Sequence, residues 1–174
     1  MGIKQLSGTY IPAEDRILLR VSTDAGEEFR FWMTRPITGK LLAAIHAAAM
    51  RTIAEKFPPQ VAETVAEFEL EAIHAQTRLD DEFLPGATLP LGEPPVLVVK
   101  LTAAEQADHV SLDLTLSNGI NFNLRLPRRL AQQFGVLLDE LQLKGKWGLS
   151  QASFTEAAED IPATSALQGR KIVH

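Results

Sequence analysis

Histidines and clustered carboxylates are the side chains of this chain that could bind a metal ion or transfer a proton. Glu71 and His74 form a Glu-x-x-His pair at helical spacing, a pattern used by di-iron helical bundles. Those sites need a second such pair and two further carboxylates, and the sequence contains only one pair. We therefore interpret Glu71 and His74 as neighbours on one helix face, and we predict no metal and no cofactor.

Catalytic motifs are missing as well. The sequence contains no Gly-rich phosphate loop, no nucleophile elbow, no HExxH motif and no cysteine. Glu14 and Asp15 could form a catalytic carboxylate pair, but the matching Asp108 before a later strand favours a role in turns for both aspartates. We predict no catalytic residue and expect a non-enzymatic protein, with an enzyme of unknown class as an alternative.

A basic and aromatic row is the strongest candidate for a binding site. In "DRILLRVSTDAGEEFRFWMTRP" apolar and polar residues alternate on both sides of a turn, so side chains alternate between two faces of a strand pair. The outward positions include Arg16, Leu18, Arg20, Arg30 and Trp32.

Two interpretations of this row remain open. In the first, the row is a self-satisfied sheet surface on which Arg20 or Arg16 pairs with Glu28 across the strands. In the second, the row is an interaction face, because Trp and Arg are over-represented in binding hot spots and an outward Trp beside an outward Leu is costly to leave in water.

We predict a protein partner or self-association for this face. Single-stranded nucleic acid is the alternative ligand, because three arginines around one aromatic ring suit a backbone and its bases. The net charge of −5 weighs against it, since phosphate neutralisation needs Lys and Arg.

The elements that position these residues form a repeat. Residues 3–45 align with residues 96–138 at an offset of 93 without a gap, and apolar positions match in kind. Identical pairs include Asp15/Asp108, Leu19/Leu112, Gly26/Gly119, Phe29/Phe122 and Arg35/Arg128.

Each unit is predicted to contain three strands and a helix. In the second unit, "HVSLDLTL" and "NFNLRL" alternate around Asn118-Gly119, the preferred pair of a type I′ hairpin, and Pro127 opens a helix. The helix of the first unit begins near Thr38. The strand positions predicted to face the core are Ile17, Leu19, Val21, Phe29, Phe31, Met33, Val110, Leu112, Leu114, Phe122, Leu124 and Leu126.

The predicted fold is α+β, with two β-β-β-α units forming one antiparallel sheet and helices packed on one face, related by a pseudo-two-fold axis. We expect one domain over residues 1–150, with units at about 3–57 and 96–143. An inserted helix covers about 60–79 and a linker about 80–94. Residues 151–174 are small and polar, and we expect a flexible tail.

A dense local signature lies within residues 10–36, and it contains "EDRILLRV", "EFRFW" and "TRP". It resembles a family of small uncharacterised proteobacterial proteins with the pattern EDRxLLRV…EFRxWxTR, and the resemblance implies no activity. That family carries a second basic residue after Thr34-Arg35, where this chain has Pro36. A role based on paired arginines therefore does not carry over.

The predicted architecture is also similar to that of the PUR and Whirly families of single-strand nucleic-acid binders. Their repeats usually have four strands, whereas we count three, and no specific motif matches. The resemblance is limited to architecture and implies only that a duplicated sheet can bind single strands.

Composition is that of a globular protein, with 45% hydrophobic and 22% charged residues. No apolar run approaches the roughly 18 residues of a membrane-spanning helix. No long apolar stretch marks the first residues as a secretory signal. We therefore expect a cytoplasmic protein without a membrane partner.

Overall fold

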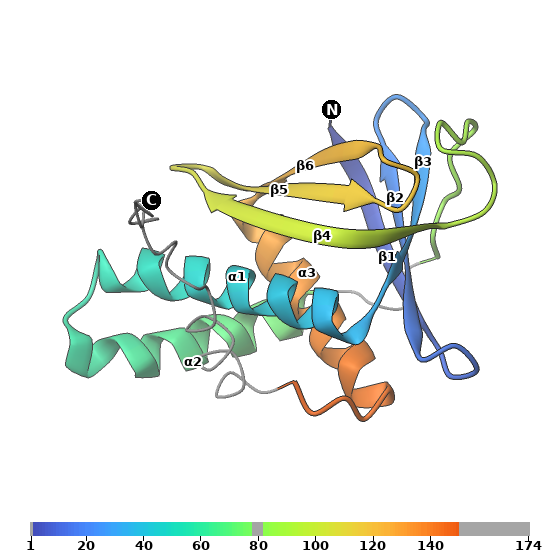
Figure 1. Ribbon diagram of the computed structural model, residues 1–174. Helices are drawn as coiled ribbons and strands as arrows, with labels where there is room; N and C mark the ends of the chain where they lie inside the picture. The colour runs from blue at the N-terminus through green and yellow to red at the C-terminus, as the bar shows by residue number, and fades with distance from the viewer. Residues whose placement is uncertain (1, 78–81, 150–174) are drawn as a thin grey trace, which may run out of the picture.

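The computed structural model describes residues 2–77 and 82–149, which form an α+β fold of six strands and three helices (Figure 1). In chain order the elements are β1 (Ile3–Ile11), β2 (Arg16–Thr23), β3 (Glu28–Met33), α1 (Arg35–Ala54), α2 (Pro59–Gln76), β4 (Val96–Glu105), β5 (His109–Leu116), β6 (Asn121–Pro127) and α3 (Arg128–Lys144).

The sheet is mixed, with the strand order β1-β2-β3-β4-β5-β6. Four of its neighbouring pairs are antiparallel, but β3 pairs with β4 in parallel, with Phe31 opposite Val96 and Trp32 opposite Leu97. The prediction of a purely antiparallel sheet is therefore wrong at this junction. The physical reason is that two helices and a long segment separate β3 from β4, and a long crossover permits parallel pairing.

The predicted pseudo-two-fold symmetry is not confirmed. A two-fold axis makes contacts reciprocal, so a β3–β4 pair would require a matching β6–β1 pair. The strand order instead leaves β1 and β6 at opposite edges of an open sheet. The two halves are thus joined through different strands, β3 of the first half and β4 of the second, which is a head-to-tail arrangement.

The helices cover the inner face of the sheet, as predicted. Figure 1 shows β1–β3 steeply inclined to β4–β6, with the helices in the angle between them. Helix α1 packs against β4, and α3 packs against β1, β5 and β6. Of the twelve strand positions predicted to face the core, eleven are buried and Phe122 is partly buried against them.

The helix boundaries reflect local chemistry. Helix α1 begins at Arg35, ahead of the predicted start near Thr38, because Pro36 is tolerated in a first turn. Helix α2 spans Pro59–Gln76 and buries only Ala62 among its residues. Large apolar side chains of α2 are open to solvent, since Val61 is 44% and Phe68 is 68% exposed.

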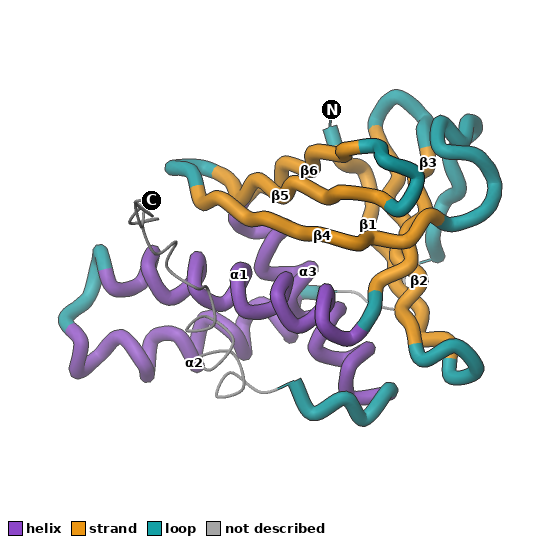
Figure 2. The backbone as a smooth tube through the Cα atoms, viewed as in Figure 1, coloured by secondary structure: helices purple, strands orange, loops and turns teal. Residues whose placement is uncertain are grey.

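Residues 82–95, which precede β4, run along the sheet. Figure 2 shows this loop running beside β3 before it enters β4. The predicted flexible tail, 151–174, lies outside the described residues. Within the described part of the chain, no helix combines the length and the apolar character that crossing a membrane requires.

Candidate interaction face

The five predicted binding residues lie on one face of β2 and β3, opposite the helices. In the antiparallel register Leu18 faces Trp32 and Arg20 faces Arg30, one step further along each strand on the same side. All five residues, including Arg16, are half-buried. Strict alternation places them together, because their strand neighbours form the core.

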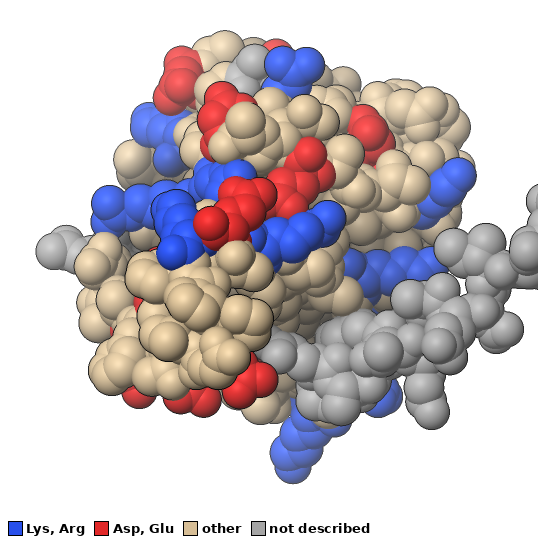
Figure 3. Space-filling view, turned by 90° about the vertical axis from the view of Figure 1, so that its left-hand side faces the viewer, with Lys and Arg blue, Asp and Glu red and all other residues tan. Residues whose placement is uncertain are grey.

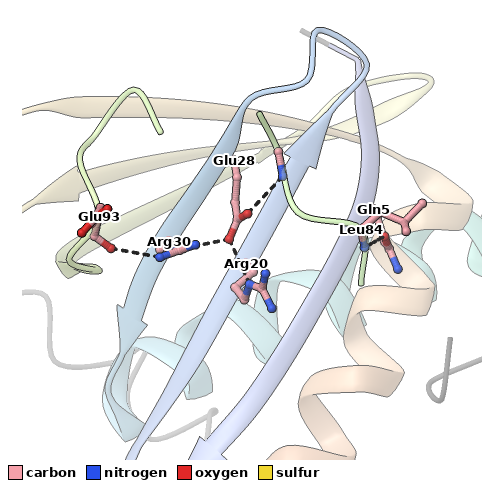
Figure 4. Close-up of polar contacts among 7 residues, drawn as sticks. Gln5, Arg20, Glu28, Arg30, Leu84 and Glu93 are labelled. Atoms are coloured by element: carbon pink, nitrogen blue, oxygen red, sulfur yellow. Dashed lines mark hydrogen bonds and ion pairs between the residues drawn. The ribbon is translucent and has the colours of Figure 1, made fainter. Parts of the chain in front are cut away.

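A buried carboxylate lies between two of the arginines. The side chain of Glu28 is 0% exposed, and its Oε1 accepts hydrogen bonds from Arg20 Nε at 3.0 Å and Arg30 Nε at 2.8 Å (Figure 4). Its Oε2 accepts a third hydrogen bond from the Gly86 N–H at 3.1 Å. The cross-strand pair Arg20–Glu28 is thus formed, and one carboxylate neutralises half of the charge of two guanidinium groups.

The ionisation of Glu28 follows from these contacts. Burial acts to raise the pKa of Glu28, because a low dielectric disfavours the charged form. Hydrogen bonds from Arg30, from Arg20 and from the Gly86 backbone outweigh burial, so that the pKa lies below its ordinary value. Glu28 is therefore a carboxylate at neutral pH, and the arginines beside it are held in place.

Residues 82–93, which we name the strap, cross this part of the outer face. Gln5 of β1 binds the strap twice. Its Oε1 accepts a hydrogen bond from the Leu84 N–H at 3.0 Å (Figure 4), and its Nε2 donates to the Glu82 carbonyl at 3.0 Å. The Glu28 N–H donates to the Thr88 carbonyl at 2.8 Å. The predicted linker is therefore fixed to the sheet through backbone hydrogen bonds.

Gly86 lies against the sheet at a place with no room for a side chain. A Cβ at this position would lie 2.5 Å from the Glu28 nitrogen and 2.6 Å from the Glu27 carbonyl carbon. No side chain other than hydrogen fits there, because both neighbours are backbone atoms. Glycine thus lets the Gly86 N–H reach the buried carboxylate of Glu28.

Strap residues also cover the two arginines. The Arg20 guanidinium carbon lies 3.9 Å from the centre of the Phe83 ring, a cation–π contact. Arg30 Nη1 donates to the Glu93 carbonyl at 3.2 Å. The side chains of Arg20 and Arg30 remain 27% and 29% exposed. Glu28, Arg20 and Arg30 therefore all have partners within the chain.

The far end of the face is different in character. Leu18 and Trp32 face each other across β2 and β3, and Leu97 pairs with Trp32 on the next strand, so that an apolar row crosses three strands. Arg16, two positions before Leu18 on β2, has a side chain that is 39% exposed, and it lies 3.6 Å from the exposed Glu14 carboxylate, a weak surface pair. This end can contact an apolar surface and keep one arginine available to it.

The sequence analysis missed a group of hydrogen bonds around a buried tryptophan. Trp147 is 2% exposed, and its Nε1 donates to Asp15 Oδ1 at 2.6 Å. Tyr10 donates to the same oxygen at 2.8 Å and meets the Trp147 ring edge-to-face. The hydrogen bonds from Trp147 and Tyr10 lower the pKa of Asp15. The only signal in the sequence was an isolated Trp after the last helix.

Metal-binding geometry is absent from the described residues, where no three His, Asp or Glu side chains gather around a common point. Glu71 and His74 are both exposed on α2. His46 lies 3.3 Å from Asp139 through its Nε2, a contact between α1 and α3.

Charged side chains of both signs lie side by side on the face shown in Figure 3. Where β4 ends, Glu105 lies 3.1 Å from Arg51 of α1 and 3.7 Å from Arg128 of α3. The contacts link the two helices to the sheet, and their mixed signs give no continuous basic surface.

We found no protein family, curated protein or solved structure that matches this chain.

Proposed function

We propose that the protein is a non-enzymatic interaction protein that binds a protein partner through the outer face of β2 and β3. The observation that carries the proposal is the half-exposed row of Leu18 and Trp32, which lies beyond the strap and has an available arginine beside it. Tryptophan and arginine dominate binding hot spots. In this proposal Leu18, Trp32 and Arg16 contact the partner, whereas Arg20 and Arg30 hold the surface in shape through Glu28.

The contacts that Arg20 and Arg30 already make favour a protein ligand over single-stranded nucleic acid. A phosphate would have to compete with the buried carboxylate of Glu28 for Arg20 and Arg30, whose Nε atoms are already bonded. The chain as a whole has a net charge of −5. If the ligand were a nucleic acid, its affinity would fall steeply with salt concentration. The Arg16→Glu substitution would abolish its binding.

The test compares retained partners for three purified chains: the wild type, Trp32→Ala and the control Leu143→Ala. Leu143 is 67% exposed on α3, so its removal deletes an equally apolar surface residue away from the face. We expect a partner that the wild type and the control retain and Trp32→Ala loses. A folded Trp32→Ala chain that retains every partner contradicts the proposal.

Self-association through the same face is measured separately. Light scattering over a range of concentrations distinguishes a monomer from a dimer. A dimer that Trp32→Ala dissociates would identify the partner as a second copy of the chain. A monomer at every concentration would leave a different protein as the partner.

We infer further that the two halves derive from one β-β-β-α unit by duplication. The inference is supported by the start residues of the elements, which are 3, 16, 28 and 35 in the first half and 96, 109, 121 and 128 in the second, a constant offset of 93. Only the first half carries the basic and aromatic outer row. Duplication would thus have kept the inner face and changed the outer one.

A further inference from the structure

A cavity of about 340 Å³ lies among the three helices, on the side of the molecule away from the outer sheet face. Figure 1 shows α1 and α2 running side by side as a hairpin, with α3 crossing them. The volume is at the lower end of the range found for small-molecule sites. The rim is open to solvent, because Met50 is 36% and Leu70 is 43% exposed.

The body of the cavity is apolar. Its depth comes from small side chains, because Ala49 and Ala66 leave space that larger residues would fill. Apolar and small lining residues are Ile45, Ala49, Met50, Ile53, Ala66, Leu70, Ile73, Gly135 and Val136. A ligand therefore needs a compact hydrocarbon or aromatic part.

The polar groups of the cavity are almost all hydrogen-bond acceptors. Glu63, Glu67 and Glu69 of α2 belong to its lining, and among the described lining residues there is no Lys or Arg. A carboxylate only accepts hydrogen bonds. The one amide in the lining is Gln132 of α3. The site thus offers negative charge beside an apolar surface.

His46 of α1 also belongs to the lining. Its Nε2 lies 3.3 Å from Asp139 Oδ2, and a carboxylate can only accept, so the Nε2 of a neutral imidazole carries the hydrogen. The other ring nitrogen, Nδ1, is then an acceptor. This atom is buried and has no hydrogen-bond partner among the described residues. Because solvent does not reach this atom, the acceptors open to a ligand are the exposed glutamates of α2.

We propose that this cavity binds a small organic cation, an amine attached to a compact apolar body. The ammonium group pairs with the glutamates of α2 and supplies N–H donors, and the apolar body occupies the space beside Ala49 and Ala66. An anion of the same shape is repelled by the glutamates. A neutral molecule of the same shape makes the apolar contacts but gains no ionic attraction to the glutamates.

The test uses three probes with one carbon skeleton: 2-phenylethylamine, 2-phenylethanol and phenylacetate. Each is titrated into the full-length chain, with chemical shifts of the methyl groups of Ile45, Ile73 and Val136 as the readout. We expect the amine to bind with a Kd in the millimolar range or below and to bind about tenfold more tightly than the alcohol. Binding of the alcohol as tight as that of the amine, or no binding by the amine, overturns the proposal.

Two variants and a matched control locate the binding. Glu67→Gln removes a lining carboxylate, and Glu71→Gln makes the same change one turn later, outside the lining. We expect the first to weaken amine binding several-fold and the second to leave it unchanged. Ala66→Leu fills the cavity and should abolish binding by a folded chain. Unchanged binding by Ala66→Leu places the amine elsewhere and contradicts the assignment.

Discussion

Glu28 is the residue on which the outer face depends. One carboxylate, with a fully buried side chain, accepts hydrogen bonds from two arginines of neighbouring strands and from the backbone of the strap. Arginines 20 and 30 face each other in the register, and two like charges directly opposite destabilise a strand pair. The negative charge of Glu28 between the two guanidinium groups offsets that repulsion.

Glu28→Gln therefore lowers stability. The substitution keeps the shape but leaves two partly exposed guanidinium groups without a counter-charge, and we expect a loss of about 1–3 kcal/mol in the free energy of unfolding. Denaturant unfolding measures the loss. Glu93→Gln is the control, because Arg30 contacts only its carbonyl oxygen. Equal stability of Glu28→Gln and the wild type would show that the arginines are satisfied by water.

Asp15 determines part of the acid response. Hydrogen bonds from Trp147 and from Tyr10 lower its pKa, so its contribution to stability is present above the ordinary value of 3.8 and is lost as the pH falls through the folded-state value. Asp15→Asn should destabilise the protein at neutral pH and flatten the decline in stability below about pH 4. Asparagine also tolerates the positive φ of 48° at this position.

Unfolding by denaturant between about pH 6 and about pH 2.5 measures this change. Glu14→Gln serves as the control. It removes a carboxylate from the same turn, and the only partner of that carboxylate among the described residues is the partly exposed Arg16. An acid decline in Asp15→Asn as steep as that of the wild type would contradict a role for Asp15.

Sequence reasoning reached only some of these contacts. Strand alternation brings Arg20 and Glu28 to one face of neighbouring strands, so their pairing could be predicted. The bond from Gly86 to Glu28 joins residues 58 positions apart, and that from Trp147 to Asp15 joins residues 132 apart. No local periodicity reports such contacts, because both come from loops whose path depends on the finished sheet.

At the scale of elements, the position of the strap depends on the absence of a side chain at Gly86. Gly86→Ala places a Cβ against two backbone atoms of the β3 region, and we expect the strap to move away from the sheet with a loss of about 1–3 kcal/mol. Amide hydrogen exchange at Glu28 and Ala87 should accelerate, because both N–H groups bond across this junction, to Thr88 and Gly26. Leu84→Ala, at a side chain that is 54% exposed, is the control. Unchanged exchange in Gly86→Ala would contradict the prediction.

Helix α2 shows the limit of prediction from periodicity. Its sequence predicts an apolar side with Val61, Phe68 and Ile73, and the helix exists almost as expected. Ile73 lines the cavity, whereas Val61 and Phe68 point to solvent. Periodicity indicates that a helix is amphipathic. It does not indicate which face packs inward when one face of the helix carries small side chains and the adjacent face carries large ones.

At the scale of the whole molecule, the two halves cover each other. Helix α1 of the first half packs against β4 of the second, and α3 of the second half packs against β1 of the first. Within this exchange, Gly8 of β1 lets Leu137 and Leu141 of α3 approach the strand. The core is therefore shared between the halves, even though each half contains its own three strands and a helix.

The shared core predicts that neither half folds alone. Fragments 1–79 and 80–174 divide the chain before the strap, so each keeps three strands and its helix but loses the helix that covers its first strand. We expect each fragment alone to lack a cooperative thermal transition by circular dichroism, because the exposed inner rows cannot offset the entropy of folding. Mixing the two should restore a transition that depends on concentration. A cooperative transition in either isolated fragment would instead show that the β-β-β-α unit is a folding unit in its own right, and that the exchange of helices between halves was added to an already stable fold.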